Sequence, residues 1–243
     1  MRIKIISNPK KDWAKSLAKE ISSYLAQGGR HSIVKSGADA TICIGGDGTI
    51  LYANHKGRLE GTILGIGSDK SYICQIHRNE WRDSLIKVLE SASTVRIMTL
   101  DGEVGGKAYS AINDLVVHAT KYRVVELEIG ISADDIKPPS RSSFEGDGVI
   151  FSSSIGSTGY AFSAGGGKHA PAERRIAIVP ICPYKRTFAP SSLDESGAAS
   201  LTVGRDCAFI VDGVFVRNLK AGEKLSVKKG KDMIFFEGVG RNV

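Results

Sequence analysis

The sequence predicts a two-part fold, with an α/β domain in the N-terminal part of the chain and a β-rich, β-sandwich-like domain after it. Before about residue 93, apolar runs of strand length alternate with stretches of helical periodicity, which is typical of a parallel sheet covered by helices. After that point strand follows strand with short turns, and helical periodicity is nearly absent. We therefore expect a three-layer α/β domain over residues 1–95 and a β-rich domain over 96–243. We leave open that the C-terminal tail packs back on the first domain.

The elements expected in the first domain are short apolar strands that end at turn-forming residues, with amphipathic helices between them. The first strand ends before the pair Asn8-Pro9, and the first helix ends at Gly28-Gly29. The expected strands are 3–6, 31–34, 40–44 and 62–67, and the expected helices begin near Trp13, Thr49 and Trp81.

The second domain is expected to be antiparallel. Apolar and polar residues alternate in several of its strands, as over residues 125–129, where Val, Leu and Ile are separated by Glu. The expected strands are 95–100, 107–111, 114–118, 124–131, 148–152, 176–180, 207–211, 224–227 and 233–237.

Composition and charge are those of an ordinary globular protein with an anionic partner. The 243 residues are 42% hydrophobic and 24% charged, and the net charge of +7 favours nucleotides, polyphosphate or nucleic acid as ligands. The densest basic groups are Lys10-Lys11 and Lys228-Lys229-Gly230-Lys231, and neither is interleaved with aromatic residues. We interpret both as solvated faces and expect no nucleic-acid partner.

Four cysteines, Cys43, Cys74, Cys182 and Cys207, are widely spaced, and no CxxC pair or His at metal-ligand spacing accompanies them. We interpret them as small buried hydrophobic residues in a reducing compartment. No signal sequence precedes the first strand, and no apolar run approaches the length of a membrane span. The sequence therefore predicts a cytoplasmic protein with no membrane partner and no metal held by its own side chains.

The stretch Gly45-Gly46-Asp47-Gly48-Thr49 follows the expected strand 40–44 directly. Paired glycines let the backbone adopt positive φ and let a ligand approach closely, and a helix that starts near Thr49 as N-cap would present free N–H groups. Both features suit a phosphate. Asp47 can bind Mg²⁺ there, or it can accept the proton of a hydroxyl that is being phosphorylated. The alternative is a tight turn in which Asp47 only accepts bonds from backbone N–H groups.

Two further stretches carry polar groups where packing alone does not need them. In the apolar run 111–117, Asn113-Asp114 offers an amide and a carboxylate, which suit the edge of a base or a ribose diol, although a β-turn explains the pair equally well. Residues 145–167 form an acidic turn, a strand, a Gly-Ser-Thr-Gly turn and a helix of small residues that ends in three glycines. Hydroxyl and N–H groups gather where that helix would start, and this predicts a second anion site, with a plain strand-turn-helix as the alternative.

These three stretches occur in this order and at this separation in the NAD kinase family, which the chain resembles over nearly its whole length. The family motif Gly-Gly-Asp-Gly-Thr matches Gly45–Thr49, its Asn-Glu pair corresponds to Asn113-Asp114, and its Asp-Gly strand and Gly-Ser-Thr-Ala-Tyr turn correspond to 147–160. The resemblance is to a short, prokaryotic or archaeal type of member.

The resemblance implies that the first domain binds a nucleotide and that the chain phosphorylates the 2′-hydroxyl of the adenosine ribose of NAD to give NADP. ATP or inorganic polyphosphate would be the donor, with Mg²⁺ held mainly by the donor phosphates. It also implies a homodimer or homotetramer. Asp47 would be the catalytic proton acceptor, and Gly45, Gly46, Gly48 and Thr49 would surround the transferred phosphoryl group. The implied contacts to NAD are Asp47, Gly48, Asn113, Asp114, Arg123, Glu145, Asp147, Thr158, Gly159, Tyr160, Ala161, Phe162 and Ser163.

The chain departs from the family pattern at several of these positions. Asp114 stands where Glu is usual, Gly159 where Ala is common, and Glu145 where many members have a basic residue. The loop around 69–73 replaces a Gly-Arg-Leu-Gly-Phe type of loop, which changes any contact of that loop to the nucleotide. We interpret these as changes of donor or cofactor preference.

Two other functions remain as alternatives. A dinucleotide-binding sensor that keeps the fold without the chemistry would bind NAD or NADP and transfer no phosphoryl group, but the intact turn around Asp47 argues against it. A lipid kinase would need an apolar entrance, whereas Asn113-Asp114 and the Ser157-Thr158 turn favour a polar substrate.

Overall fold

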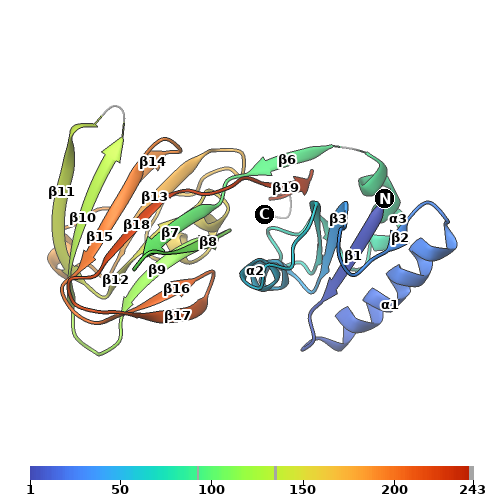
Figure 1. Cartoon of the computed structure of the whole chain (residues 1–243), viewed down its shortest axis with the longest axis horizontal. Helices are drawn as coiled ribbons and strands as arrows, with labels where there is room; N and C mark the ends of the chain where they lie inside the picture. Colours follow the sequence, from blue (N-terminus) through green and yellow to red (C-terminus); the bar gives the residue numbers. More distant parts are fainter. Residues whose placement is uncertain (92, 134–135, 241–243) are drawn as a thin grey trace. The chain divides into compact units, whose positions relative to one another are not determined.

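The structure is a computed structural model that describes residues 1–91, 93–133 and 136–240 (Figure 1). It divides into two compact units, Met1–Ile97 with the segment from Met233 onward, and Met98–Asp232. The chain thus enters the second unit after Ile97 and leaves it after Asp232. The domains expected from the sequence were 1–95 and 96–243, of which residues 241–243 lie outside the described part.

The first unit contains one sheet, in the order β2-β1-β3-β4-β19-β6, with β5 paired to β4. All neighbouring strands are parallel except β6, which is antiparallel to β19. The strands are β1 (Arg2–Ser7), β2 (Ser32–Ile33), β3 (Ala40–Ile44), β4 (Thr62–Gly67), β5 (Ile76–His77), β6 (Thr94–Ile97) and β19 (Met233–Phe236). The strand nearest the C-terminus therefore belongs to the N-terminal sheet.

Helices cover both faces of this sheet. One face carries Ile42, Ile44, Leu64 and Ile66, which pack in one core with the apolar sides of α1 (Asp12–Gln27) and α3 (Trp81–Glu90). On the other face α2 (Asp47–His55) packs closely, since a Cβ placed on Gly65 would lie 2.9 Å from Cδ1 of Ile50. The alternation of strand side chains produces the expected three layers.

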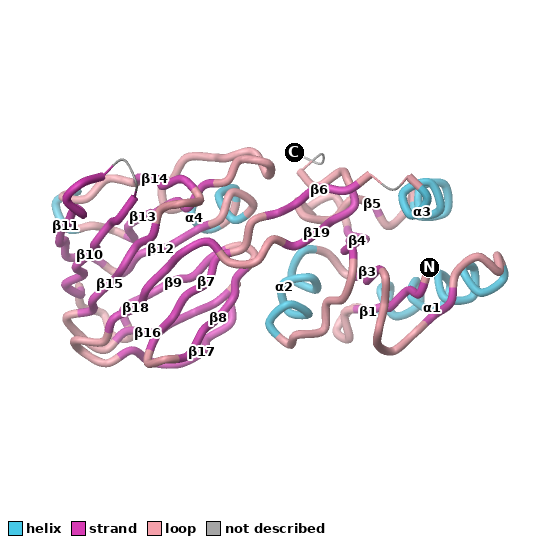
Figure 2. The backbone as a smooth tube through the Cα atoms, turned by 45° about the horizontal axis from the view of Figure 1, so that its top comes forward, coloured by secondary structure: helices cyan, strands magenta, loops and turns pink. Residues whose placement is uncertain are grey.

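The second unit is built from two antiparallel sheets, and helix is nearly confined to the first unit (Figure 2). One sheet has the order β11-β10-β15-β18-β7-β8 and the other β14-β13-β12-β9-β16-β17. The strands of the first are β7 (Leu100–Val104), β8 (Lys107–Ala111), β10 (Val125–Ala133), β11 (Ile136–Gly146), β15 (Ala198–Val203) and β18 (Lys224–Lys229). Those of the second are β9 (Asp114–Ala119), β12 (Gly148–Ser152), β13 (Arg175–Ile181), β14 (Ser191–Asp194), β16 (Cys207–Val211) and β17 (Val214–Leu219).

The core of this unit lies between the two sheets. It contains alternate residues of every central strand, among them the fully buried Leu127, Phe151, Phe209 and Leu225. The outer face of the β12 sheet is also apolar where the short helix α4 (Tyr160–Ser163) covers it. The predicted fold class, α/β followed by a β-rich sandwich, is confirmed.

Some elements differ from the expectation. The strand expected over 95–100 is split into β6 and β7, because the chain passes between the units there. The strands β5, β11, β14, β15 and β17 were not predicted. Polar or small residues conceal the apolar period in β11, β14 and β15, β5 has only two residues, and the apolar residues of β17 are consecutive and do not alternate. The helix of small residues expected after Gly159 is only α4, preceded by a 3₁₀ turn over Gly156–Thr158. In the described part of the chain no helix is long and apolar enough to cross a membrane.

Candidate functional site

The glycine turn joins β3 to α2 at the carboxyl end of the first sheet. Gly45 and Gly46 have φ of 142° and 93°, and both N–H groups donate to the carbonyl of Ile66, at 3.0 and 3.3 Å. A Cβ on Gly45 would lie 2.5 Å from both Cβ of Asn8 and Oγ1 of Thr49, so no larger residue fits this turn. The first N–H groups of α2, which have no intrahelical acceptor, open onto the same turn.

Thr49 is not the N-cap of this helix, and that expectation was wrong. The helix begins at Asp47, the capping position is Gly46, and the N–H of Thr49 donates to the carbonyl of Gly46 at 2.9 Å. Thr49 is buried, and its hydroxyl accepts a bond of 3.4 Å from the amide of Asn8. Its side chain therefore supports the turn from behind, while Gly48 is exposed.

The carboxylate of Asp47 is held by a neighbouring loop. Oδ2 accepts the N–H of Tyr72 at 2.7 Å, and Oδ1 accepts those of Ile73 and Cys74 at 2.9 and 3.3 Å. The structure therefore contains the backbone hydrogen bonds of the alternative that the sequence left open. The carboxylate remains only partly buried, and these bonds fix its orientation.

Two glycines in β4 allow the loop to come this close. A Cβ on Gly65 would lie 2.8 Å from Sγ of Cys74, and one on Gly67 would lie 2.2 Å from Oγ of Ser71. Burial raises the pKa of the Cys74 thiol well above its usual value, and the nearby Asp47 carboxylate raises it further. Cys74 is thus a neutral packing group. Burial was predicted for all four cysteines, and Cys43, Cys74 and Cys207 are buried, but the prediction was wrong for Cys182, which is exposed directly after the end of β13.

Lys11 was missed as a site residue in the sequence. Its Nζ donates to the carbonyl of Gly45 at 2.7 Å and lies 3.9 Å from where a Cβ on Gly46 would be. Lys11 and Arg78 also lie near the ring of Trp13, at 5.7 and 5.1 Å from its centroid. The strand order could have indicated this contact. Lys11 follows β1, and the end of β1 lies beside the end of β3, where the glycine turn begins.

In the second unit, Asp114 begins β9, Asn113 directly precedes it, and both are fixed by a buried carboxylate. Asp212 accepts the backbone N–H groups of Ile112, Asn113 and Asp114, at 2.9, 2.7 and 3.1 Å. Among the residues that the structure describes, Oδ1 of Asn113 is buried and has no hydrogen-bond partner. A buried acceptor of this kind is costly unless a ligand donates to it.

Asp114 is 8% exposed and titrates near neutral pH. Burial is the main cause that raises its pKa, to about 7, and the negative charge of Asp212 adds to it. Because the Asp212 carboxylate accepts three N–H groups, we assign the charge to Asp212 and the proton to Asp114 below this pH. At neutral pH the Asp114 carboxyl can therefore either donate or accept a hydrogen bond.

The hydroxyl-rich turn packs directly on Asn113. A Cβ on Gly156 would lie 2.2 Å from the carbonyl oxygen of Asn113, so this position requires glycine. Ala161 is buried on the outer face of the sheet, whereas Tyr160 and Phe162 are 44% and 47% exposed. Both rings are thus partly exposed, and Nζ of Lys168 lies 4.6 Å from the centroid of the Phe162 ring.

The hydroxyl groups of this turn bond to local carbonyls. Oγ1 of Thr158 donates to Ile155 at 3.3 Å, and Oγ of Ser163 donates to Gly159 at 3.2 Å. The pKa of Tyr160 is raised, mainly by burial and then by Cys182, Asp114 and Asp147. Asp147 and Asp114 thus both act on the same tyrosine.

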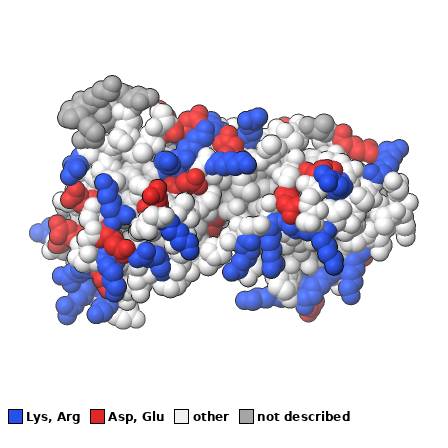
Figure 3. Space-filling model, viewed as in Figure 1, with Lys and Arg blue, Asp and Glu red and all other residues white. Residues whose placement is uncertain are grey.

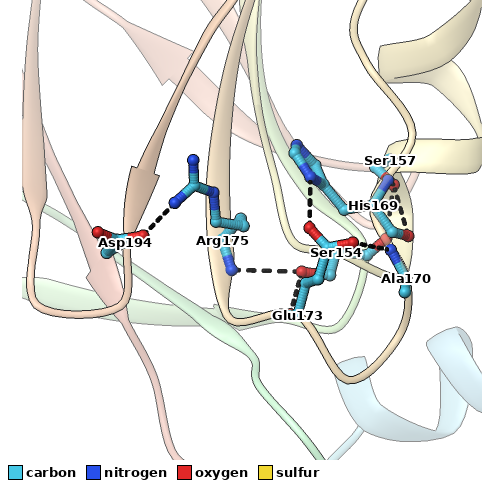
Figure 4. Close-up of polar contacts among 7 residues, drawn as sticks. All are labelled: Ser154, Ser157, His169, Ala170, Glu173, Arg175 and Asp194. Atoms are coloured by element: carbon cyan, nitrogen blue, oxygen red, sulfur yellow. Dashed lines mark hydrogen bonds and ion pairs between the residues drawn. The ribbon is translucent and has the colours of Figure 1, made fainter.

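A loop behind the turn is held by Glu173 (Figure 4). Its carboxylate accepts the N–H of Ala170 at 2.9 Å and contacts Nδ1 of His169 at 3.1 Å. The backbone N–H of His169 in turn donates to Oγ of Ser157 at 2.9 Å. The bond to Ala170 first, and then His169, lowers the pKa of Glu173. These contacts give the turn a fixed support.

Arg123 and Glu145 are not brought together with Asn113 and Asp114. Arg123 is exposed in the turn that follows β9. Asp114 is the first residue of this strand, so Arg123 lies past the far end of the strand from Asp114. Glu145 is exposed on the outer face of the other sheet, directly across from Glu126, because its neighbour Phe144 points into the core. The carboxylate of Glu145 therefore points away from α4, which covers the outer face of the β12 sheet.

No group of three or more His, Cys, Asp or Glu residues could hold a metal ion within the described residues. Asp47 is the acidic residue of the glycine turn, and its oxygens already accept three N–H bonds. A divalent ion at this turn would need most of its ligands from a bound phosphate chain.

Comparisons with known proteins point in one direction. Residues 113–236 match the family model described as "ATP-NAD kinase C-terminal domain". The NAD kinase of Geobacter sulfurreducens is 30% identical in an alignment of 238 positions that covers 89% of this chain and 81% of that protein. The NAD kinase of Prosthecochloris aestuarii is 28% identical in an alignment of 262 positions, gaps included, that covers 96% of this chain and 90% of that protein.

Two solved structures share the fold. An NAD kinase from Archaeoglobus fulgidus in complex with ATP superimposes with a TM-score of 0.83 at 21% identity, over 100% of this chain and 97% of that one. Yeast NADH kinase complexed with NADH gives a TM-score of 0.86 at 18% identity, over 100% and 84%. At these identities the likeness concerns the fold.

The raised pKa of Asp114 predicts a pH-dependent stability. The folded carboxyl keeps its proton up to about pH 7, whereas in the unfolded chain it ionises near 3.8, so wild-type stability falls as the pH rises through this window. The amide of Asp114→Asn cannot ionise, so the variant does not lose stability in this way. The free energy of unfolding of the variant minus that of wild type should therefore be larger at pH 8 than at pH 4, by at most about 4 kcal/mol. Denaturant unfolding at both pH values, with exposed Glu128→Gln as the control, measures this difference. An equal difference at the two pH values would contradict the assignment.

Proposed function

This chain belongs to the NAD kinase family, and we propose that it transfers the terminal phosphoryl group of ATP to the 2′-hydroxyl of the adenosine ribose of NAD. Its activity is that of an NAD kinase, which forms NADP. The choice of ATP is supported by the description of the matching family model and by the ATP complex of the structurally similar archaeal enzyme. Inorganic polyphosphate is the alternative donor.

Most of the support for the reaction comes from Asp47, which stands at the first position of α2 directly after two glycines of positive φ. Of its two oxygens, Oδ1 accepts two backbone bonds and Oδ2 only one. A carboxylate oxygen has two lone pairs, so we assign Oδ2 as the atom that takes the proton from the ribose hydroxyl. Removal of this proton makes a poor nucleophile effective as the P–O bond forms.

The glycine turn and Lys11 would hold the donor. The free N–H groups at the start of α2 and the exposed Gly48 offer hydrogen bonds to phosphate oxygens. The ammonium group of Lys11 uses one bond on the Gly45 carbonyl and keeps two donors for the ligand. Its positive charge would offset the repulsion between the donor and Asp47.

We expect Mg²⁺ to be held mainly by the donor phosphates, because the described side chains form no metal cluster. When bound, the ion would neutralise charge that develops on the transferred phosphoryl group. The residues of the turn keep their roles of binding and orienting the donor.

The dinucleotide would be bound by the second unit. The unpartnered Oδ1 of Asn113 can accept a hydrogen bond from a ribose hydroxyl or an amide, and Asp114 can act beside it in either protonation state. Asp147 and the turn residues 158–163 complete this group around the exposed rings of Tyr160 and Phe162. Arg123 and Glu145 have no part in our scheme, since they point elsewhere.

A homodimer or homotetramer and a cytoplasmic location remain part of the proposal, on the resemblance alone. A sensor without chemistry, the alternative from the sequence, is less well supported because the turn around Asp47 is intact and the relatives reported above are NAD kinases.

Substitution of Asp47 tests the proton acceptor. Asp47→Asn should lower kcat for NADP formation by about 10²- to 10⁴-fold while NAD binding is largely kept, because the amide cannot take a proton. A coupled NADP assay and calorimetry with NAD provide the two measurements. Asp69→Asn, an exposed carboxylate of the adjacent loop that pairs with His77, is the matched control.

The outcomes are distinct. An undiminished rate in Asp47→Asn would exclude the assigned role, whereas wild-type protein that forms no NADP from NAD and Mg²⁺ with either ATP or polyphosphate would exclude the function itself.

Substitution of Lys11 tests the donor site. Lys11→Ala loses a charged hydrogen bond to phosphate, so its KM for ATP should rise about 10- to 100-fold with little change in NAD affinity. Lys11→Arg keeps the positive charge, and its KM for ATP should lie between those of wild type and Lys11→Ala. Steady-state kinetics with each substrate varied in turn measures the effect. The exposed neighbour Lys10→Ala is the control, and an equal rise in both variants would count against a specific contact.

A further inference from the structure

Three turns at one end of the second unit enclose a hollow of about 760 Å³. The turn after β9 contributes Lys121 and Arg123, the turn after β15 contributes Arg205 and Asp206, and the turn after β17 contributes Ala221, with Asn218 at the end of β17 beside it. This volume is in the range of small-molecule sites. Figure 3 shows Lys and Arg side chains gathered at the end of the unit where these turns lie in Figure 1.

The hollow has an excess of positive charge that the protein does not neutralise. The side chains of Lys121, Arg123 and Arg205 form no hydrogen bond or ion pair with the residues that the structure describes. Asp206 is the acid of the lining, and it already accepts Nζ of Lys220 at 2.7 Å and the N–H of Ala221 at 3.3 Å. The hydrogen bond from Lys220 is the main cause that lowers the pKa of Asp206, and the positive charge of Lys121 lowers it further. The lining therefore holds three cations and one carboxylate, and that carboxylate is already hydrogen-bonded to a fourth cation, Lys220.

The turns that carry these cations are fixed to one another. Oγ1 of Thr120 donates to the carbonyl of Asp206 at 3.2 Å, and the N–H of Gly204 donates to Glu126 at 2.8 Å. The backbone packs closely here, because a Cβ on Gly204 would lie 3.0 Å from that of Glu126. The cations are thus brought together by backbone geometry, and little ordering is needed when a ligand binds.

The hollow is separate from the residues assigned to the dinucleotide. Asp114 and Ala119 stand at opposite ends of β9, and five residues of extended strand span about 17 Å. The hollow is lined from Ala119 onward, and Tyr160 and Phe162 belong to the outer face of the sheet. A ligand here would leave the proposed reaction groups of this unit unoccupied.

We propose that this hollow binds a small phosphorylated molecule with at least two negative charges, held by Lys121, Arg123 and Arg205. Guanidinium groups bind phosphate oxygens in pairs, and two turns that carry cations suit phosphates on two sides of a ligand. No aromatic side chain lines the hollow within the described residues, so recognition rests on the phosphates and not on stacking with a base. The site goes beyond the proposed kinase reaction.

Calorimetric titration with pyrophosphate tests the site. The whole chain should bind pyrophosphate in this hollow, and Lys121→Ala/Arg205→Ala should lose about tenfold or more of that affinity. Lys224→Ala/Lys228→Ala, which removes two exposed lysines of β18 and the same charge, should bind as wild type does. Parallel titrations with orthophosphate and fructose 1,6-bisphosphate distinguish adjacent from separated phosphates, and binding of any one of them that needs Lys121 and Arg205 supports the site.

Two results would overturn the proposal. One is pyrophosphate binding of the same affinity and stoichiometry in wild type and Lys121→Ala/Arg205→Ala. The other is an equal loss in both double variants, which would reflect general charge. A donor site at the glycine turn would add a second pyrophosphate site that both double variants keep, so failure of the hollow and failure of the kinase assignment are distinguishable. NADP formation without added pyrophosphate should persist in Lys121→Ala/Arg205→Ala and confirms that the variant is folded.

Discussion

Both units depend on the same interaction, an aspartate carboxylate that accepts three consecutive backbone N–H groups. In the first unit Asp47 binds residues 72–74, and in the second unit Asp212 binds residues 112–114. Hydrogen bonds to an ionised acceptor are strong, and a carboxylate deprived of them in a partly buried place is destabilising. Each aspartate therefore orders a segment that is distant in sequence and that regular secondary structure does not fix.

The two carboxylates differ in what they leave free. Asp212 is 8% exposed and positions Asn113 and Asp114, and its charge adds to the burial that raises the pKa of Asp114. Asp47 is more accessible and keeps a lone pair on Oδ2 in our scheme. The same chemistry thus serves as scaffolding in one unit and, as we propose, as part of the reaction in the other. Asp47 can accept backbone hydrogen bonds and also take a proton in the proposed reaction. In the sequence analysis these two roles were alternatives.

Sequence patterns predicted the fold class and the glycine turn well, because both depend on local regularities. The period of apolar residues gave α1 and α3, and paired glycines after a buried run gave the turn. Thr49 was taken as the cap because hydroxyl residues favour that position, but the geometry of Gly46 starts the helix earlier. Lys11 was interpreted as a solvated residue, since only the neighbouring register of β1 and β3 brings it to Gly45. β11 is an edge strand whose residues 140–143 are exposed, so no apolar alternation revealed it.

The position of β19 has a consequence for biosynthesis. Met233–Phe236 adds its strand to the sheet of the first unit between β4 and β6, and all of the second unit precedes it in the chain. During translation the sheet of the first unit lacks β19, and the edge of β4 stays unpaired until this late strand has been made. The second unit is complete earlier and can fold beforehand. A nascent chain arrested before Met233 would expose the edge of β4, where strands of other molecules can add.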